Sequence, residues 1–268
     1  YKFSYRNDHT MNEKYYAKKR FGQHFLIDQQ IIRAIVSNIN PRPNDIIIEI
    51  GPGNGALTKP IAYFNPNLHI IELDRDLIPT LEKKFSLCPN ISIHQGDALE
   101  FNYASIGQKL RLIGNLPYNI STPLMFHLIQ YRNNIYDQHF MLQKEVANRL
   151  AALPGGKTYG KLTIMFGTYM HTQHLFNVPA NAFKPAPKVI SSVVKITPKP
   201  DDQIIIKNPT ILSRIVTQAF SQRRKTLRNS LKGLISDNIM EQMEVNPTQR
   251  AEEIPILTWS KLANTIKE

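Results

Sequence analysis

The alternation of short β-branched runs with helix-like stretches constrains the fold of this chain more than any other feature. Five runs of five to seven residues have the composition of strands, and between them lie periodic stretches such as Asp28–Ile39, Asp74–Phe85 and Thr122–Gln130. This alternation predicts an α/β fold, with a mostly parallel sheet and helices on both of its faces. The predicted strands are Asp45–Ile50, Leu68–Asp74, Ile91–Gln95, Leu110–Asn115 and Gln138–Leu142.

The last third of the chain predicts a different arrangement. Two runs, His171–Val178 and Val189–Thr197, could add an antiparallel pair at the edge of the sheet, and Pro198–Asp202 has the composition of a linker. After it, Asn208 and Pro209 suit the cap and first turn of a helix, and apolar residues then recur at helical spacing. The predicted parts are a basic N-terminal extension (1–20), an α/β domain (21–198) and a small helical domain (199–268).

Positive charge is concentrated in two segments of an otherwise neutral chain. The sequence has 33 Lys and Arg against 21 Asp and Glu, which gives a net charge of +12. Residues 1–20 carry +4 and residues 183–232 carry +9, which leaves −1 for the remainder. Two basic segments on a neutral body predict a nucleic-acid partner, with solubility or an anionic membrane surface as the alternative interpretation.

Cysteine, histidine and hydropathy narrow the class of protein further. The single cysteine, Cys88, excludes a disulfide framework and a multi-cysteine zinc site, and it fits a reducing cytoplasm. The eight histidines show no metal-binding spacing, so we expect no metal. No apolar run approaches the ~20 residues that cross a bilayer, so we expect no membrane partner.

The segment Ile46–Gly55 predicts a buried strand that runs into a glycine-rich turn. Glycines at Gly51, Gly53 and Gly55 let the backbone approach a ligand closely. The dinucleotide fingerprint would have its third glycine at position 56, where this chain has Ala56. The turn therefore suits a nucleoside-sized ligand without phosphates, although tight strand-to-helix turns also use glycine for packing alone.

Acidic residues end the next two predicted strands. Glu72 lies 21 positions after Gly51, where a carboxylate can bind both hydroxyls of a ribose. Asp74 is expected to cap the helix that follows. Asp97, after the third strand, could accept a hydrogen bond from an adenine amine, with an ordinary loop aspartate as the alternative. Together with the glycine turn, these residues predict a nucleoside cofactor.

The residues after the fourth predicted strand, Gly114–Tyr118, predict chemistry on an exocyclic amine. Such an amine is a weak nucleophile because its lone pair is delocalised into the base. The amide oxygen of Asn115 and a backbone carbonyl of Leu116 or Pro117 can hold its two hydrogens and align the lone pair with a sulfonium methyl group. Tyr118 can stack on a base that has left its RNA strand. A plain Asn-x-Pro turn with a core tyrosine is the alternative.

These segments, in this order, resemble the ribosomal RNA adenine dimethyltransferase family. Lys19–Leu26 is similar to its N-terminal motif, Glu49–Gly55 to its cofactor loop and Asn115–Tyr118 to its catalytic motif. Phe183–Val189 is similar to its substrate-side loop. Phe220–Leu231 is similar to the helical signature of the branch that modifies the small ribosomal subunit. In combination these motifs are highly specific.

The resemblance covers roughly residues 14–268 and implies both a fold and an activity. The fold is a Rossmann-like S-adenosylmethionine methyltransferase sheet with helices on both faces, followed by a small helical, RNA-binding domain. The activity is S-adenosylmethionine-dependent dimethylation of two adjacent adenosines in a hairpin near the 3′ end of 16S rRNA, with a role in small-subunit assembly. The implied partners are small-subunit rRNA and the immature small subunit, and we expect a cytoplasmic monomer.

The resemblance also implies roles for individual residues. Phe183 is expected to flank the target base or to pack in the core. Five basic residues without an acidic one lie in the segment 220–232, which favours contacts with RNA phosphates over a merely solvated helix face. The expected residues are Asn115, Leu116, Pro117 and Tyr118 for catalysis; His24, Leu26, Gly51, Gly53, Glu72, Asp97 and Asn115 for the cofactor; and Phe183, Lys188, Arg223, Arg224, Lys225 and Arg228 for RNA.

Four other activities are weighed against this prediction. A large-subunit rRNA adenine dimethyltransferase of the macrolide-resistance type lacks the Phe220–Leu231 signature. A relative that only binds nucleic acid would not need both Gly51–Gly55 and Asn115–Tyr118 intact. A glutamine methyltransferase usually has proline where this chain has Leu116, and a DNA adenine enzyme is expected to carry a sequence-reading domain, which this sequence does not show. Cys88 precedes Pro89 in a predicted loop, so we interpret it as structural rather than as a nucleophile.

Overall fold

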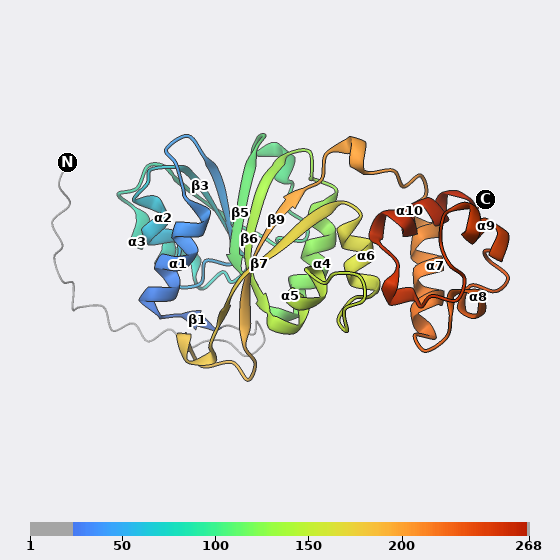
Figure 1. Cartoon of the computed structure of the whole chain (residues 1–268). Helices are drawn as coiled ribbons and strands as arrows, with labels where there is room; N and C mark the ends of the chain where they lie inside the picture. Colours follow the sequence, from blue (N-terminus) through green and yellow to red (C-terminus); the bar gives the residue numbers. More distant parts are fainter. Residues whose placement is uncertain (1–23, 267–268) are drawn as a thin grey trace.

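A central sheet of seven strands organises the computed structural model, which describes residues 24–266 (Figure 1). The predicted basic extension, residues 1–20, lies outside the described residues. The strands are ordered β4-β3-β2-β5-β6-β9-β7 across the sheet. Their bounds are β2 (Ile46–Ile50), β3 (Asn67–Glu72), β4 (Ile91–Gln95), β5 (Leu110–Asn115), β6 (Ile135–Gln143), β7 (Met170–Val178) and β9 (Ser191–Pro198).

The predicted sheet is confirmed in its topology. Strands β4, β3, β2, β5 and β6 run parallel, and β9 pairs antiparallel with both β6 and β7. The five predicted strands and the antiparallel pair are all present. The predicted strand that ends at Asp74 stops at Glu72, and β6 begins at Ile135 rather than at Gln138. Because β2 to β6 are parallel, their carboxyl ends lie at one edge of the sheet.

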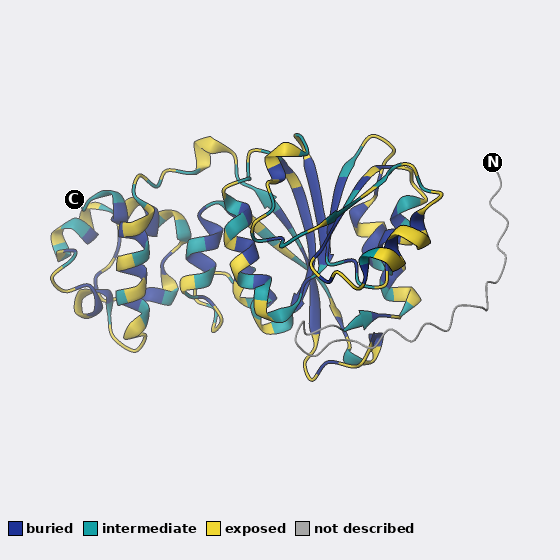
Figure 2. Cartoon of the chain, turned by 180° about the vertical axis from the view of Figure 1, so that it is seen from behind, coloured by how far each residue is buried: buried dark blue, intermediate teal, exposed yellow. Residues whose placement is uncertain are grey.

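Helices cover both faces of the sheet, as predicted. Helices α1 to α3 pack on one face around Ile47, Leu68 and Ile70, and α4 to α6 pack on the other around Ile48, Leu112 and Phe140. Figure 2 shows the strands as the most buried part of the molecule. The helix bounds are α1 (Gln29–Ile39), α2 (Thr58–Ala62), α3 (Ile78–Phe85), α4 (Tyr118–Ile129), α5 (Lys144–Leu150), α6 (Lys161–Gly167), α7 (Pro209–Ser221), α8 (Leu227–Ser230), α9 (Asp237–Gln242) and α10 (Ile256–Asn264).

Two helix starts differ from the predicted ones. Helix α3 was expected to begin after an Asp74 cap, but it begins at Ile78, and the Oδ1 atom of Asp74 accepts a hydrogen bond from the N–H of Asp76 within a turn. Helix α4 begins at Tyr118, four residues before the predicted Thr122. The start of α3 is delayed by the Asp74 turn, and neither helix start is marked by periodicity alone.

A short second sheet lies at the carboxyl edge and was not predicted. Strand β1 (Phe25–Leu26) pairs antiparallel with β8 (Phe183–Lys184), so the N-terminal segment contacts the predicted substrate-side loop. The backbone N–H of Ile27 also donates to the carbonyl of Ala182. Two residues in each strand are too few to show the period-2 pattern by which sequence reasoning finds a strand.

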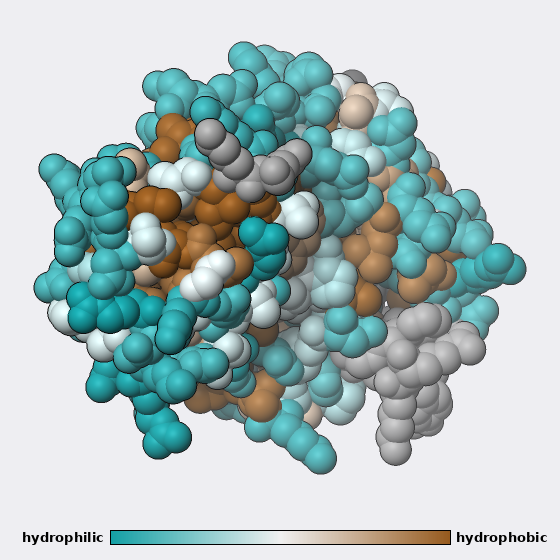
Figure 3. Space-filling model, turned by 90° about the vertical axis from the view of Figure 1, so that its right-hand side faces the viewer, coloured by the Kyte–Doolittle hydropathy of each residue, from teal (hydrophilic) through white to brown (hydrophobic). Residues whose placement is uncertain are grey.

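The C-terminal helices α7 to α10 form a unit beside the sheet domain, with α6 between the two (Figure 1). Asn208 caps α7 and Pro209 begins it, as predicted. The core of this unit includes Tyr159 and Ile164, which precede the predicted boundary at residue 198. The two cores therefore meet at α6, whose Phe166 packs with the sheet core. Figure 3, seen from this end, shows hydrophilic side chains around an apolar area.

Neither a membrane span nor a metal cluster occurs in the part of the chain that the structure describes. Among residues 24–266, no helix combines the length and the apolar character needed to cross a bilayer. The same residues contain no group of three or more His, Cys, Asp or Glu side chains placed to hold a metal ion. Cys88 is a free thiol that packs against the core beneath α3, which agrees with its structural interpretation.

Candidate active site

The carboxyl ends of β2, β3, β4 and β5 surround a cleft, and β1 covers one of its sides. All ten residues predicted for the cofactor and for catalysis line this cleft, although they come from five separate parts of the chain. Ligands of open α/β sheets bind at this edge because the loops after the parallel strands converge there. The residues are His24, Leu26, Gly51, Gly53, Glu72, Asp97, Asn115, Leu116, Pro117 and Tyr118.

The glycine turn after β2 has the backbone geometry that its sequence predicts. Gly51, Gly53 and Gly55 have φ angles of +64°, +57° and +77°, which only glycine adopts without strain. A Cβ atom on Gly53 would lie 2.9 Å from a ring carbon of Phe25 in β1. The turn therefore needs glycine both for its φ angles and for the close approach of β1.

Two acidic side chains are held in place by backbone N–H groups at the ends of β3 and β4. The Oε1 atom of Glu72 accepts a hydrogen bond of 2.8 Å from the N–H of Asp74. Burial raises the pKa of Glu72, and hydrogen bonds from backbone N–H groups oppose this shift. The Oδ1 atom of Asp97 accepts a hydrogen bond of 2.8 Å from the N–H of Leu99. Each carboxylate has further lone pairs with which it can accept hydrogen bonds from a ligand.

Glu49 is a third carboxylate of this cleft, and the sequence analysis gave it no role of its own. It is 2% exposed, and Thr58 donates a hydrogen bond of 2.6 Å to its Oε2 atom. Burial raises its pKa to about 7. The signal in the sequence was a single charged residue inside the apolar run Ile46–Ile50. A cleft with Glu49 and Glu72 in its wall favours a cationic ligand, because a nearby positive charge stabilises ionised carboxylates.

Asn115, the last residue of β5, is half-buried and has a fixed amide orientation. Its Nδ2 atom donates a hydrogen bond of 2.9 Å to the backbone carbonyl of His24. A carbonyl oxygen can only accept, so the nitrogen of the Asn115 amide must face His24. The amide oxygen therefore remains available to a donor in the cleft, which is the role predicted for it.

The remaining residues of the predicted catalytic motif lead from β5 into α4. The N–H of Leu116 donates to the carbonyl of Met141, and the carbonyl of Pro117 accepts from the N–H groups of Ile120 and Ser121 in α4. Since the Pro117 carbonyl is already used by the helix, the Leu116 carbonyl is the better candidate for the second amine hydrogen. Tyr118 is half-buried at the first turn of α4, as a partner for a planar base requires.

The predicted substrate-side loop divides into a buried part and an exposed part. Phe183 is 4% exposed and packs in the core with Leu26, and it is absent from the cleft wall. Its position fits the core alternative and does not bring it to a target base. Lys188 is exposed, and it is followed by the exposed apolar residues Val189 and Ile190. Lys184, Pro185 and Ala186 of this loop are exposed as well, so RNA can reach the loop on both sides of the buried Pro187.

The basic residues after α7 fall into two groups. Arg223 donates hydrogen bonds to the carbonyls of Lys157 and Tyr159, and Arg228 donates one of 2.6 Å to Asp237. These two side chains have partners inside the protein. Arg224 and Lys225 are exposed. The four residues were predicted as one RNA-binding group. Arg223, two residues after α7, also connects the end of this helix to the loop before α6 through hydrogen bonds.

Comparison with known proteins gives one family and one fold. The model of the family described as ribosomal RNA adenine dimethylase matches residues 15–268. The ribosomal RNA small subunit methyltransferase A of Pseudomonas aeruginosa is 50% identical over 255 residues, which cover 94% of this chain and 95% of that protein. The protein of the same name from Dechloromonas aromatica is 47% identical over 248 residues, which cover 92% of this chain and 97% of that protein.

Two solved structures resemble the whole molecule. A dimethyladenosine transferase from Plasmodium falciparum superposes with a TM-score of 0.78 at 26% identity, covering 89% of this chain and 96% of that one. The 23S rRNA methyltransferase ErmE superposes with a TM-score of 0.71 at 22% identity, covering 91% of this chain and 100% of that one. At 22% identity, the similarity to ErmE shows a common fold and no more.

Proposed function

This chain belongs to the ribosomal RNA adenine dimethylase family, and from that membership we propose that it dimethylates two adjacent adenosines near the 3′ end of small-subunit rRNA. Membership of this family shows that the chain is a methyltransferase. The observation that carries the finer proposal is the Asn115 amide, whose oxygen is left to accept from a ligand because its nitrogen donates to the His24 carbonyl. That arrangement suits a substrate group that donates hydrogen bonds, as an exocyclic amine does.

The residues of the cleft fit S-adenosylmethionine. In this proposal Glu72 binds the ribose hydroxyls and Asp97 accepts from the adenine amine. The missing Cβ atom at Gly53 makes room for the Phe25 ring of β1, which lines the same cleft. Glu49 adds a buried carboxylate that favours a cationic ligand, and the methionine part of S-adenosylmethionine carries an ammonium and a sulfonium. His24 and Leu26 line the side of the cleft that β1 covers. When bound, S-adenosylmethionine supplies an electrophilic methyl group.

Asn115 and the Leu116 carbonyl would then orient the target amine. Each accepts one hydrogen, so the nitrogen lone pair points away from both and out of conjugation with the ring. Tyr118 holds the base by stacking. Orientation of this kind contributes most of the rate when no strong base is needed, since the nitrogen becomes acidic once it is methylated and its proton can pass to water. A monomethylated amine keeps one hydrogen, so only one acceptor acts in the second transfer.

The C-terminal helices would supply the contact with RNA phosphates. Arg224 and Lys225 are exposed at the end of α7, and Lys188 is exposed in the substrate-side loop. Basic side chains that contact phosphates position an RNA without reading its sequence. We propose that the partner is small-subunit rRNA within an immature small subunit, since two relatives carry the name small subunit methyltransferase. Those relatives are bacterial, so the proposed site of action is the cytoplasm.

The experiment is mass mapping of methylated adenosines. Small and large ribosomal subunits that lack the modification are incubated separately with the protein and S-adenosylmethionine. We expect dimethyladenosine at two adjacent positions near the 3′ end of 16S rRNA and none in large-subunit rRNA. Modification of the large subunit alone would support the macrolide-resistance alternative. The absence of any methylated adenosine would contradict the proposed function.

A further inference from the structure

The orientation of the Asn115 amide depends on a residue 91 positions away in the sequence. The acceptor is the backbone carbonyl of His24, immediately before β1. If the amide turned by 180°, two carbonyl oxygens would face each other and the Asn115 nitrogen would face the cleft. The site would then offer a donor where an amine needs an acceptor.

The His24 carbonyl is itself held by the imidazole of the same residue. Its Nδ1 atom lies 2.8 Å from the carbonyl oxygen of Pro185, which follows β8. Because that oxygen can only accept, Nδ1 carries the proton, and a neutral His24 is the Nδ1–H tautomer. The next residue, Phe25, pairs with Lys184 of the same loop. Two consecutive residues, His24 and Phe25, are therefore both bound to the substrate-side loop.

The other end of that loop contacts the second residue of the proposed base site. The hydroxyl of Tyr118 lies 3.1 Å from the hydroxyl of Ser191, at the first position of β9. Ser191 is 1% exposed, so its own side chain is shielded from water, whereas Tyr118 is half-buried. The segment 185–191 is therefore connected at its start to Asn115, through His24, and at its end to Tyr118. The rings of His24 and Tyr118 lie 5.9 Å apart between these two connections.

We propose that His24 is a positioning residue, whose ring, fastened to the Pro185 carbonyl, fixes its own carbonyl and thereby the orientation of the Asn115 amide. The segment 185–191 then couples RNA contact at Lys188 to the geometry of the site that orients the amine. This inference rests on the proposed function and goes beyond contact between His24 and the cofactor. It assigns the His24 side chain an effect on the rate of methyl transfer.

Three substitutions separate this role from others. His24→Asn keeps an N–H donor at the position of Nδ1, since Nδ1 of histidine and Nδ2 of asparagine are both bonded to Cγ. His24→Leu removes the donor at similar volume, and His24→Gln moves it one bond further out. His171→Leu is the matched control, because His171 is an exposed histidine of β7 away from the cleft. If His24→Leu does not fold, His24→Gln replaces it.

The first measurement is the rate of single-turnover methylation at saturating cofactor and small subunits. Calorimetric titration with S-adenosylmethionine gives the cofactor affinity of the same variants. We expect His24→Leu and His24→Gln to lower the saturated rate about five- to tenfold, the size expected from one lost orienting hydrogen bond. His24→Asn should stay within about twofold of the original rate, and His171→Leu should leave it unchanged. Weaker cofactor binding with an unchanged saturated rate would overturn the proposal, since it would show His24 to act on the cofactor alone.

The second measurement needs no RNA and no activity. In protein labelled with ¹⁵N-asparagine, the side-chain NH₂ signal of Asn115 is assigned by its loss in Asn115→Asp. We expect this NH₂ group to exchange faster with water in His24→Leu and to keep its exchange rate in His24→Asn. An unchanged exchange rate in His24→Leu would overturn the positioning role even if methylation fell. If the original protein methylates no adenosine, the proposed function fails, and this signal still decides the inference.

Discussion

The two edges of the central sheet both bury charged side chains, but they satisfy them differently. At the amino edge, Arg111 of β5 and Asp137 of β6 bond to each other and to their neighbours. At the carboxyl edge, Glu49, Glu72 and Asn115 face a cleft with part of their hydrogen-bonding capacity unused. At these two edges, the Arg111 guanidinium, whose bonds are all made within the protein, supports the fold, whereas the polar groups with unused hydrogen-bonding capacity line the cleft.

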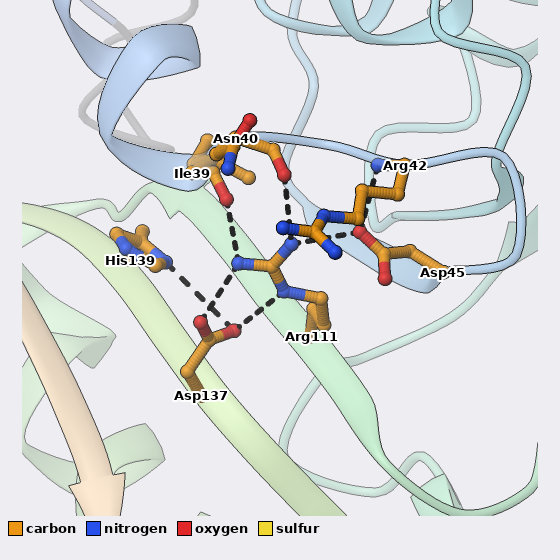
Figure 4. Close-up of polar contacts among 7 residues, drawn as sticks. All are labelled: Ile39, Asn40, Arg42, Asp45, Arg111, Asp137 and His139. Atoms are coloured by element: carbon orange, nitrogen blue, oxygen red, sulfur yellow. Dashed lines mark hydrogen bonds and ion pairs between the residues drawn. The ribbon is translucent and has the colours of Figure 1, made fainter.

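At the amino edge, every N–H of the Arg111 guanidinium has an acceptor (Figure 4). Two nitrogens donate to the carboxylate of Asp137, at 2.9 and 2.8 Å, and a third donates to Asp45 at 2.7 Å. The carbonyls of Ile39 and Asn40, at the end of α1, accept the others. Burial lowers the pKa of the adjacent His139 to about 4, so its imidazole is neutral at pH 7. The network joins α1, β5 and β6.

The largest effect is expected from breaking this saturated network. Arg111→Leu leaves Asp137, which is 1% exposed, without its cationic partner. Removing one partner of a buried ion pair typically costs about 3–5 kcal/mol of unfolding free energy. Urea denaturation measures the loss, and titration of the folded fraction with S-adenosylmethionine should give an unchanged affinity. Reduced cofactor affinity with normal stability would reverse the roles assigned to the two edges.

Asn115→Ala tests the carboxyl edge, where we expect the substitution to lower the rate of methyl transfer rather than the stability of the fold. The amide oxygen is proposed to act mainly in the transition state, and such polar contacts are typically worth ~10²–10³ in turnover. Stability should change little, because Asn115 is half-buried at the end of its strand. Single-turnover assays should report mono- and dimethyladenosine separately, since the second transfer uses one acceptor fewer. Near-normal rates for both products would show Asn115 to be structural.

Glu49 gives the cleft a pH dependence of its own. Its pKa in the folded protein is about 7, above the ordinary value of 4.5. Below pH 4.5 the side chain is protonated in both states. As the pH rises toward 7 only the unfolded state ionises, so stability falls, by about 2–3 kcal/mol between pH 5 and 8. In Glu49→Gln, urea denaturation at the two pH values should lack this loss. Parallel pH profiles for the two proteins would contradict the assignment.

The smallest effect is expected from substitutions of the basic residues after α7. Here too, a side chain that is bonded within the protein should affect stability, and one that is exposed without such bonds should affect binding. Replacing Arg224 and Lys225 with glutamine should lower the salt dependence of RNA binding by about 0.7–0.9 units of the log–log slope per lost phosphate contact. Arg223→Gln should instead lower the thermal stability, because Arg223 bonds to the carbonyls of Lys157 and Tyr159. An equal loss of slope in both variants would contradict the division into two groups.

The strand ends were the most predictable part of the molecule. Gly51, Glu72, Asp97 and Asn115 each follow an apolar run, and parallel strands bring their carboxyl ends to one edge, so a correct βα alternation was sufficient to place them together. The motif resemblance added His24 and Leu26, whose two-residue strand carries no periodicity.

The residues that sequence reasoning misjudged depend on long-range contacts. Glu49 was matched to the cofactor loop, but its isoleucine neighbours gave no sign of a role for its carboxylate, which the folded structure places in the wall of the cleft. Phe183 could not be assigned to the core or to the base site until its pairing with Leu26 was known. Arg223 looked like its basic neighbours, since its carbonyl acceptors lie more than 60 positions earlier in the chain.

Hydrogen–deuterium exchange with and without S-adenosylmethionine tests the division between the two edges most directly. At saturating cofactor we expect added protection in 49–56, 72–74, 96–98 and 115–118, and unchanged exchange in 38–46, 108–111 and 135–138. The second set includes most of a separate cleft, with Asn38, Arg111 and Tyr136 in its wall. Protection confined to the carboxyl edge would support the account. Protection at the amino edge, or no protection anywhere at saturation, would contradict it.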